Sequence, residues 1–338
     1  CVCDWSSDVC SSDLTAEKAI VRGDERIDLA GIEKIYEDKL EPIYSCNIET
    51  ADNKLETFSY ETSERLHAKV RIEKPKVLIP VFPGNNCEYD SAKAFRDAGA
   101  EPEIFVINNL SAEAVAKSVE DFAAKVRESQ IIFIPGGFSG GDEPDGSGKF
   151  ITAFFRNQEV KEAVTDLLDN REGLMVGICN GFQALIKLGL VPYGKIMDID
   201  ETFPTLTFNE IGRHQSKLVR TRIASNKSPW LANAKPDEIY TVPISHGEGR
   251  FIASEELIQE LAENGQITTQ YVDFDGKVTS DIQFNPNGSY YAIEGITSPD
   301  GRVFGKMGHA ERTGAGLYKN VPGDFDIGMF KAAVEYFK

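Results

Sequence analysis

The sequence predicts an α/β fold: a doubly wound, mostly parallel sheet that carries a cysteine nucleophile elbow. Between residues 76 and 169, short apolar runs alternate with helical stretches, which is typical of strands joined by right-handed crossover helices. These runs are nearly continuously apolar, as expected of parallel strands that helices cover on both faces. The apolar run at 174–176 then leads through a glycine-flanked cysteine, Cys179, into a helical segment at 184–188.

The expected elements follow one another with short connections. We expect strands at 77–82, 104–107, 131–135 and 174–176, and helices at about 88–98, 112–127 and 160–169. Later strand-rich segments lie at 217–224, 238–242, 268–272, 290–297 and 302–306, and they either extend this sheet or form an antiparallel one. An amphipathic helix over about 325–337 closes the chain.

Three sections precede this domain, which we place at 76–338. Residues 1–14 are rich in Ser and Asp without periodicity, and they resemble the translation of a common sequencing adapter; a disordered tail is the alternative. Residues 15–45 predict a strand at 18–21, a turn at Gly23-Asp24 and a helix from 29 to 40, too little to form a core alone. Residues 46–75 are polar, end at a proline and predict a linker.

Composition excludes several classes of protein. A net charge of −18 argues against a nucleic-acid partner, and no apolar run reaches the length of a membrane span. The N-terminus shows no signal-peptide pattern. Three of the six cysteines fall in the first ten residues, and the others (Cys46, Cys87, Cys179) are far apart. This spacing predicts neither a disulfide framework nor a metal site, and it indicates a reducing cytoplasmic environment.

Cys179 is the candidate nucleophile. At a strand–turn–helix elbow the nucleophile takes a cramped backbone conformation, and glycines two residues before and after it relieve the crowding. Its position in the first helical turn favours the thiolate, because the positive end of the helix dipole stabilises the anion. The alternative is a buried structural cysteine, but that reading does not explain Gly177 and Gly181.

His309 is the candidate general base among four histidines. It follows the predicted strand at 302–306, and sites in parallel sheets gather at the carboxyl ends of strands. Glu311, two residues later, is placed to orient the imidazole and stabilise its cationic form. A surface His–Glu pair is the alternative. His67 lies in the linker, and His214 has no obvious partner.

Two glycine-rich loops are candidates for substrate contacts. Residues 135–142, which include Gly136, Gly137 and Phe138, follow a strand, so their N–H groups and that of Asn180 are candidates for an oxyanion hole. The loop lacks the Lys and Ser/Thr of a phosphate-binding P-loop. Residues 245–250 form either a substrate-binding loop or a simple tight turn.

Four ordered motifs, GICNGFQ, PGGFSGGD, SHGEGRF and GHAER, resemble the glutaminase domains of phosphoribosylformylglycinamidine synthases, which are triad-type (class I) glutamine amidotransferases. The resemblance covers residues 76–338. Residues 15–75 resemble the end of the synthetase portion and the connecting linker of the fused form. This implies a C-terminal fragment whose ATP- and Mg-dependent synthetase domains lie upstream in the same polypeptide, with no cofactor or metal in the fragment itself.

The resemblance implies a role for each candidate residue. Cys179 would be the nucleophile, His309 the general acid/base and Glu311 its orienting carboxylate. Gly136, Gly137, Phe138 and Asn180 would line the oxyanion and substrate site, Gln183 would help hold glutamine, and Ser245 and His246 would contact its α-amino and carboxylate end. Related loops often have an aromatic residue where this chain has Gly140.

The expected reaction is glutamine hydrolysis through a cysteine thioester. The ammonia would serve the ATP-dependent amidation of formylglycinamide ribonucleotide in purine biosynthesis. Two other readings stay open: a stand-alone cysteine hydrolase of the same fold, and a non-catalytic scaffold domain.

Overall fold

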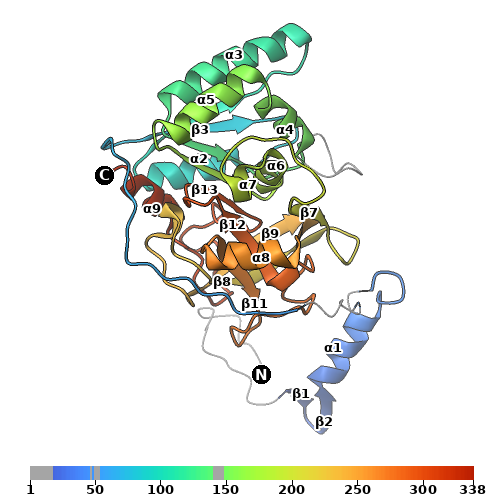
Figure 1. Cartoon of the computed structure of the whole chain (residues 1–338). Helices are drawn as coiled ribbons and strands as arrows, with labels where there is room; N and C mark the ends of the chain where they lie inside the picture. The colour runs from blue at the N-terminus through green and yellow to red at the C-terminus, as the bar shows by residue number, and fades with distance from the viewer. Residues whose placement is uncertain (1–17, 46–47, 49–53, 140–147) are drawn as a thin grey trace, which may run out of the picture. The chain divides into compact units, whose positions relative to one another are not determined.

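The computed structural model describes residues 18–45, 48, 54–139 and 148–338, and the chain forms two compact units (Figure 1). The first unit ends at Glu49 and the second begins at Thr50. The predictions for residues 1–14 lie outside the described residues. Within the part of the chain that is described, no helix is both long and apolar enough to cross a membrane.

The first unit contains a hairpin and one helix. Strands β1 (Ala19–Arg22) and β2 (Glu25–Asp28) pair antiparallel, and α1 (Leu29–Asp38) follows directly. Asp28 caps α1 by accepting a hydrogen bond from the N–H of Gly31. No residue of α1 is buried. The predicted strand, turn and helix are therefore confirmed, whereas β2 was not predicted. None of residues 18–45 is buried.

A nine-stranded mixed sheet forms the centre of the second unit. Its order is β4-β3-β5-β6-β13-β12-β11-β8-β9. The parallel half contains β3 (Lys76–Val81), β4 (Glu101–Val106), β5 (Ile131–Ile134), β6 (Leu174–Ile178) and β13 (Val303–Lys306). The other half adds β12 (Ile293–Thr297), β11 (Ile267–Val272), β8 (Gln215–Ile223) and β9 (Ile239–His246) in antiparallel pairs. The later strands thus extend the same sheet in antiparallel fashion.

Helices cover the parallel half on both faces, which confirms the doubly wound α/β prediction. Figure 1 shows α3 (Ala112–Glu128) and α5 (Gln158–Asp169) on one side of β3, and α2 (Glu88–Asp97) on the other. Ser111 and Asn157 cap α3 and α5 with side-chain hydrogen bonds to backbone N–H groups, which explains where both helices begin. Strands β5 and β6 are completely buried, as their apolar runs predict.

Several elements were not predicted from the sequence. A small separate sheet pairs β7 (Thr205–Phe208) with β10 (Glu248–Ile252). The additional helices are α4 (Lys149–Phe155), α7 (Leu190–Tyr193) and α8 (Glu255–Glu263). Helix α9 (Met329–Glu335) lies within the predicted helix at 325–337, and α6 (Asn180–Leu188) contains the predicted segment at 184–188 but begins four residues earlier. Strands β7 and β10 and helices α4 and α7 are each at most seven residues long, which is too short for a clear period. Helix α8 is amphipathic and begins after the capping residue Ser254, so its pattern was an available signal.

The predicted linker is packed along the second unit from residue 54 onward. Phe58 is buried, and its N–H donates to Oε1 of Gln270. The N–H groups of Ala68 and Ile72 donate to the carbonyls of Tyr336 and Phe337, near the C-terminus. A polar segment with isolated apolar anchors has no strong sequence period, so its packing depends on contacts with distant residues.

Candidate active site

Cys179 lies at a strained turn between β6 and α6. Its φ of 53° and ψ of −106° fall where side chains other than glycine are rarely found, as at other nucleophile elbows. The N–H of Cys179 donates to the carbonyl of Lys306 on β13. Its Sγ lies 3.9 Å from the carbonyl oxygen of Ser245. Only 3% of the residue is exposed, so the thiol reacts only with a ligand that enters the site.

The glycines on either side of Cys179 are required by close packing. A Cβ atom at Gly177 would lie 2.5 Å from the carbonyl carbon of Gly181. A Cβ atom at Gly181 would overlap the carbonyl oxygen of Ile134 on β5. The tight turn therefore needs glycine at both places, as the sequence pattern predicts. A cysteine with only a structural role would not explain this requirement.

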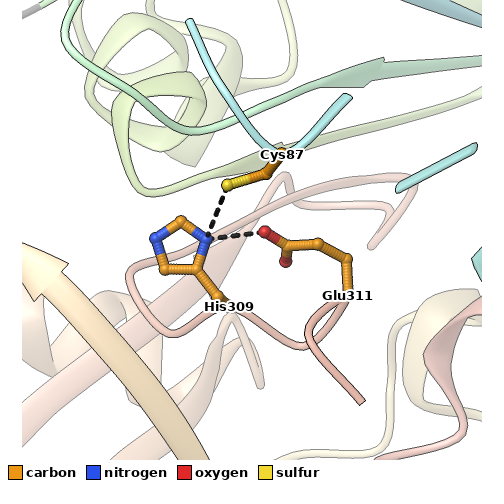
Figure 2. Close-up of side chains that lie close together, drawn as sticks. All are labelled: Cys87, His309 and Glu311. Atoms are coloured by element: carbon orange, nitrogen blue, oxygen red, sulfur yellow. Dashed lines mark hydrogen bonds and ion pairs between the residues drawn. The ribbon is translucent and has the colours of Figure 1, made fainter. Parts of the chain in front are cut away.

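His309 and Glu311 lie at the same sheet edge as the elbow. Strand β13 is parallel to β6 with Lys306 opposite Ile178, so the chain leaving each strand reaches the same edge. Nδ1 of His309 is 2.6 Å from Oε1 of Glu311, and both side chains are buried (Figure 2). The N–H of His309 donates to the carbonyl of Pro243 on β9, which holds this turn in place.

The carboxylate of Glu311 favours the cationic form of His309. Burial alone would lower the pKa of His309, but the charge of Glu311, with hydrogen bonds to Cys179, Cys87 and Glu311, raises that pKa well above its usual range. Burial alone would raise the pKa of Glu311, but the charge and hydrogen bond of His309 outweigh burial, so the pKa of Glu311 is lowered. Imidazolium and carboxylate therefore stabilise one another next to the Cys179 sulfur.

Replacing Glu311 with glutamine should lower both the pKa of His309 and the rate of glutamine hydrolysis. The variant keeps the shape of the side chain but loses the charge that raises the pKa. We expect kcat to fall by at least about 100-fold, the usual contribution of a positioned acid/base group. The His309 Cε1 proton signal, followed by NMR against pH, should titrate at lower pH than in the wild type; an unchanged titration would contradict this role of Glu311.

The backbone of Gly136 lies against both reacting side chains. A Cβ atom at Gly136 would be 2.6 Å from Cε1 of His309 and 3.4 Å from Cβ of Cys179. Gly137 has a φ of 125°, and a Cβ there would lie 2.6 Å from Cα of Asn85. The glycine loop, which follows β5, thus meets the elbow and the imidazole at a distance that only glycine allows.

The two expected oxyanion donors are the backbone N–H groups of Gly137 and Asn180. No acceptor among the residues that the structure describes receives the N–H of Gly137. The N–H of Asn180 lies in the first turn of α6, where N–H groups have no acceptor within the helix. The Asn180 side chain is fully buried and accepts hydrogen bonds from the N–H of Ser139 and from Nδ2 of Asn85. Asn180 therefore ties the elbow to the glycine loop.

Two of the predicted substrate contacts have other partners. The side-chain amide of Gln183 accepts from Nδ2 of Asn180 and donates to the carbonyl of Glu248, so it braces the elbow, and its contact with glutamine stays a prediction. Phe138 is half-buried, and its ring lies 5.9 Å from that of His214. The rest of this loop, residues 140–142, lies outside the described residues.

Ser245 and His246 end β9 beside the triad. The hydroxyl of Ser245 is 3.2 Å from Nε2 of His214. The ring of His246 is buried, and neither ring nitrogen has a hydrogen-bond partner among the described residues. Burial, together with the charges of His309 and His214, lowers the pKa of His246 to about 3. His246 is therefore neutral at physiological pH and has hydrogen-bonding capacity available for a ligand.

His246 should make the protein less stable in mild acid. Its folded-state pKa of about 3 lies below the ordinary value of 6.5, so the unfolded chain binds a proton that the folded protein excludes. Stability is therefore lost as pH falls from 6.5 toward 3, with a slope of up to about 1.4 kcal/mol per pH unit. His246→Gln should remove this slope from free energies of unfolding measured in urea. His67→Gln, at an exposed position, should leave it unchanged.

A second thiol at the site, Cys87, was not predicted from the sequence. Cys87 precedes α2 at a φ of 71°, and its Sγ lies 3.8 Å from Nδ1 of His309 (Figure 2). Nη2 of Arg312 donates to this sulfur at 2.8 Å. The position of Cys87 after the parallel strand β3 was an available signal, because the carboxyl ends of parallel strands share one edge.

A buried ion pair behind His309 was also missed. Glu294 and Lys306 lie 3.1 Å apart, and both side chains are almost completely buried. Oε1 of Glu294 accepts from the N–H of Gly308 at 2.6 Å, and Nζ of Lys306 donates to the Gly308 carbonyl at 3.0 Å. The pair therefore fixes the residue immediately before His309.

Breaking this pair should destabilise the second unit. Glu294→Gln leaves the Lys306 charge buried without its counter-charge, so we expect a loss of about 3–5 kcal/mol in the free energy of unfolding. Asp97→Asn removes one partner of the exposed Lys93–Asp97 pair and should cost less than about 1 kcal/mol. Equal effects of the two substitutions in urea unfolding would contradict a buried, paired Glu294.

Comparison with known proteins places most of the chain in one family. Residues 74–337 match the model of the CobB/CobQ-like glutamine amidotransferase domain. Phosphoribosylformylglycinamidine synthase subunit PurQ of Methanococcus maripaludis strain C7 is 35% identical over 286 residues, which cover 78% of this chain and 97% of that protein. The same subunit of Dehalococcoides mccartyi is 36% identical over 242 residues, with 71% and 86% covered. In the structure of PurLQS from Thermotoga maritima, one chain matches with a TM-score of 0.56 and 25% identity, covering 78% of this chain and 100% of its own length.

Proposed function

Because the chain belongs to the CobB/CobQ-like glutamine amidotransferases, and among them to the PurQ-type glutaminases of phosphoribosylformylglycinamidine synthase, we propose that Cys179 hydrolyses glutamine and supplies ammonia to that synthase. The family predicted from the four sequence motifs is thereby confirmed. One observation carries the assignment of the residues: the strained elbow Cys179 shares a sheet edge with the buried His309–Glu311 pair, and a Cβ atom at Gly136 would lie 3.4 Å from Cys179 and 2.6 Å from His309.

The reaction proceeds through a covalent thioester. The Cys179 thiolate attacks the side-chain amide carbon of glutamine, and the N–H groups of Gly137 and Asn180 stabilise the oxyanion that forms. His309 protonates the leaving nitrogen, and ammonia departs as the C–N bond breaks. His309 then removes a proton from water, which attacks the thioester and releases glutamate and the free thiol.

The neighbouring groups stabilise specific stages of this reaction. Each oxyanion donor contributes about 3 kcal/mol to the transition state, so the glycine loop matters nearly as much as the triad. Glu311 stabilises the imidazolium that forms when His309 holds the extra proton. Ser245 and His246, at the end of β9, supply polar groups for the α-amino and carboxylate end of glutamine.

Ammonia is useful only when a synthetase captures it before it becomes ammonium in bulk water. We therefore infer an ATP-dependent synthetase partner, either upstream in the same polypeptide or as a separate subunit like those of the PurLQS assembly. ATP and Mg would bind in that partner, whose substrate is formylglycinamide ribonucleotide. A cytoplasmic location accords with this role in purine biosynthesis.

The test compares nitrogen donors in a coupled assay. A phosphoribosylformylglycinamidine synthetase without its own glutaminase should use ammonium salts alone, and it should use glutamine only after this chain is added. Cys179→Ala in the same assay is the matched control. A stand-alone hydrolase would instead cleave peptides or other amides without coupling, and a scaffold would release no glutamate; either result would reject the proposed function.

A further inference from the structure

Three side chains of types that bind metals, those of Cys87, His309 and Glu311, meet at the Nδ1 atom of His309. A sulfur from Cys87, the imidazole Nδ1 of His309 and a carboxylate oxygen of Glu311 all lie within 4.8 Å of one another (Figure 2). Thiolate, imidazole and carboxylate are the three ligand types that zinc prefers in proteins. The glutaminase reaction uses His309 and Glu311, but it has no role for Cys87.

We propose that Cys87, His309 and Glu311 form an inhibitory binding site for a zinc-class divalent cation. A tetrahedral zinc ion with ordinary bond lengths places its sulfur and nitrogen ligands about 3.6 Å apart. The Cys87 Sγ and His309 Nδ1 atoms are 3.8 Å apart, close to this separation. A nitrogen and an oxygen ligand lie about 3.3 Å apart, so Glu311 Oε1, now at 2.6 Å, needs only a small rotation.

The second carboxylate oxygen of Glu311 supports this site independently. Oε2 of Glu311 is buried and has no hydrogen-bond partner among the described residues. A buried carboxylate oxygen without a partner is costly, and coordination of a cation would satisfy it. Three protein ligands leave the fourth tetrahedral position for water, as in zinc sites that stay open.

An acidic cavity gives cations a route to Glu311. The cavity has a volume of about 760 Å³, and Glu311 lies in its lining. Four further carboxylates and two lysines line it: Asp90, Asp97, Asp324, Asp326, Lys93 and Lys331. The excess of negative charge raises the local concentration of cations over that of anions.

Arg312 lies against the sulfur ligand. Its guanidinium donates to Cys87 Sγ at 2.8 Å, and the thiolate is the form of cysteine that binds metal. Binding of the ion displaces this donor and releases the protons of the Cys87 thiol and of the His309 Nδ1–H group. His309 then loses its hydrogen bond to Glu311, so glutamine hydrolysis stops until the ion is removed.

Cobalt(II) is the probe for direct binding, because a Co–thiolate bond gives a sulfur-to-metal charge-transfer band. The full chain with Cys1, Cys3, Cys10 and Cys46 replaced by serine leaves only the two thiols near His309. In this background, Cys179→Ala should retain the band and its affinity. The matched substitution Cys87→Ser should weaken cobalt binding by at least about tenfold, as loss of a ligand does. Loss of the band in Cys179→Ala but not in Cys87→Ser would overturn the proposal.

Zinc inhibition is the second readout, and it rests on the proposed glutaminase function. For each variant that keeps Cys179, the measured quantity is the ratio of its glutaminase activity with zinc to its activity without zinc. Zinc should inhibit the four-serine background, a chelator should restore its activity, and Cys87→Ser should need at least about tenfold more zinc. Cobalt binding through Cys87 in a protein without glutaminase activity would reject the proposed function and leave the metal site standing. Equal zinc sensitivity of the background and Cys87→Ser would reject inhibition through Cys87.

Discussion

Replacing Cys179 with alanine is expected to lower the rate of glutamine hydrolysis by at least about 10⁴-fold. The thioester cannot form without the sulfur, and removal of a nucleophile leaves only the residual catalysis of the oxyanion donors and of binding. Alanine keeps the Cβ atom and therefore the same backbone strain at a φ of 53°, and it removes only the sulfur, so stability should not fall much. Glutamate release and urea unfolding, measured on the same preparations, separate these two effects.

The matched control is Cys46→Ala, which removes a cysteine that the sequence places in the linker. Its glutaminase rate should equal that of the wild type. A Cys179→Ala protein that still released glutamate within tenfold of the wild-type rate would assign the hydrolysis to another residue.

Replacing Gly136 with alanine is expected to lower kcat by about 100-fold or more, although Gly136 carries no functional side chain. The added methyl group would lie 2.6 Å from Cε1 of His309 and 3.4 Å from Cβ of Cys179, so the imidazole must move. A displacement of about 1 Å at a reacting group costs about 100-fold in rate. The rate of glutamate release at saturating glutamine would measure kcat directly.

Gly31→Ala provides the comparison for Gly136→Ala. A Cβ atom at Gly31 meets no atom within 4 Å, and Gly31 belongs to the first unit. Its kcat should match that of the wild type. Normal kcat in Gly136→Ala would contradict the close approach of the glycine loop to the triad.

The elbow was predictable because its constraints are local. A buried strand, two glycines and a helix around Cys179 lie within about fifteen consecutive residues, and the strain at Cys179 follows from that pattern. The strand before His309 and the spacing of Glu311 were local signals too. The rule that sites gather at the carboxyl ends of parallel strands then placed both groups on one edge.

Features that depend on distant residues were not predictable from local patterns. The approach of Cys87 to His309 joins positions 222 residues apart, and it depends on the order of the strands in the sheet. The same is true of the Glu294–Lys306 pair, where two charged residues inside apolar strands gave no sign that they are partners. The packing of residues 54–75 likewise depends on acceptors near the C-terminus, which the composition of the segment does not reveal.

The most direct test of the central claim is labelling with a diazo-ketone analogue of glutamine, followed by peptide mass spectrometry. The analogue places an electrophilic carbon where the amide carbon of glutamine would lie, so only the attacking sulfur should be alkylated. We expect one adduct per chain, on Cys179, blocked by excess glutamine and lost in Cys179→Ala. An adduct on Cys87 or elsewhere, with Cys179 unmodified, would contradict the assignment of Cys179 as the nucleophile that releases ammonia.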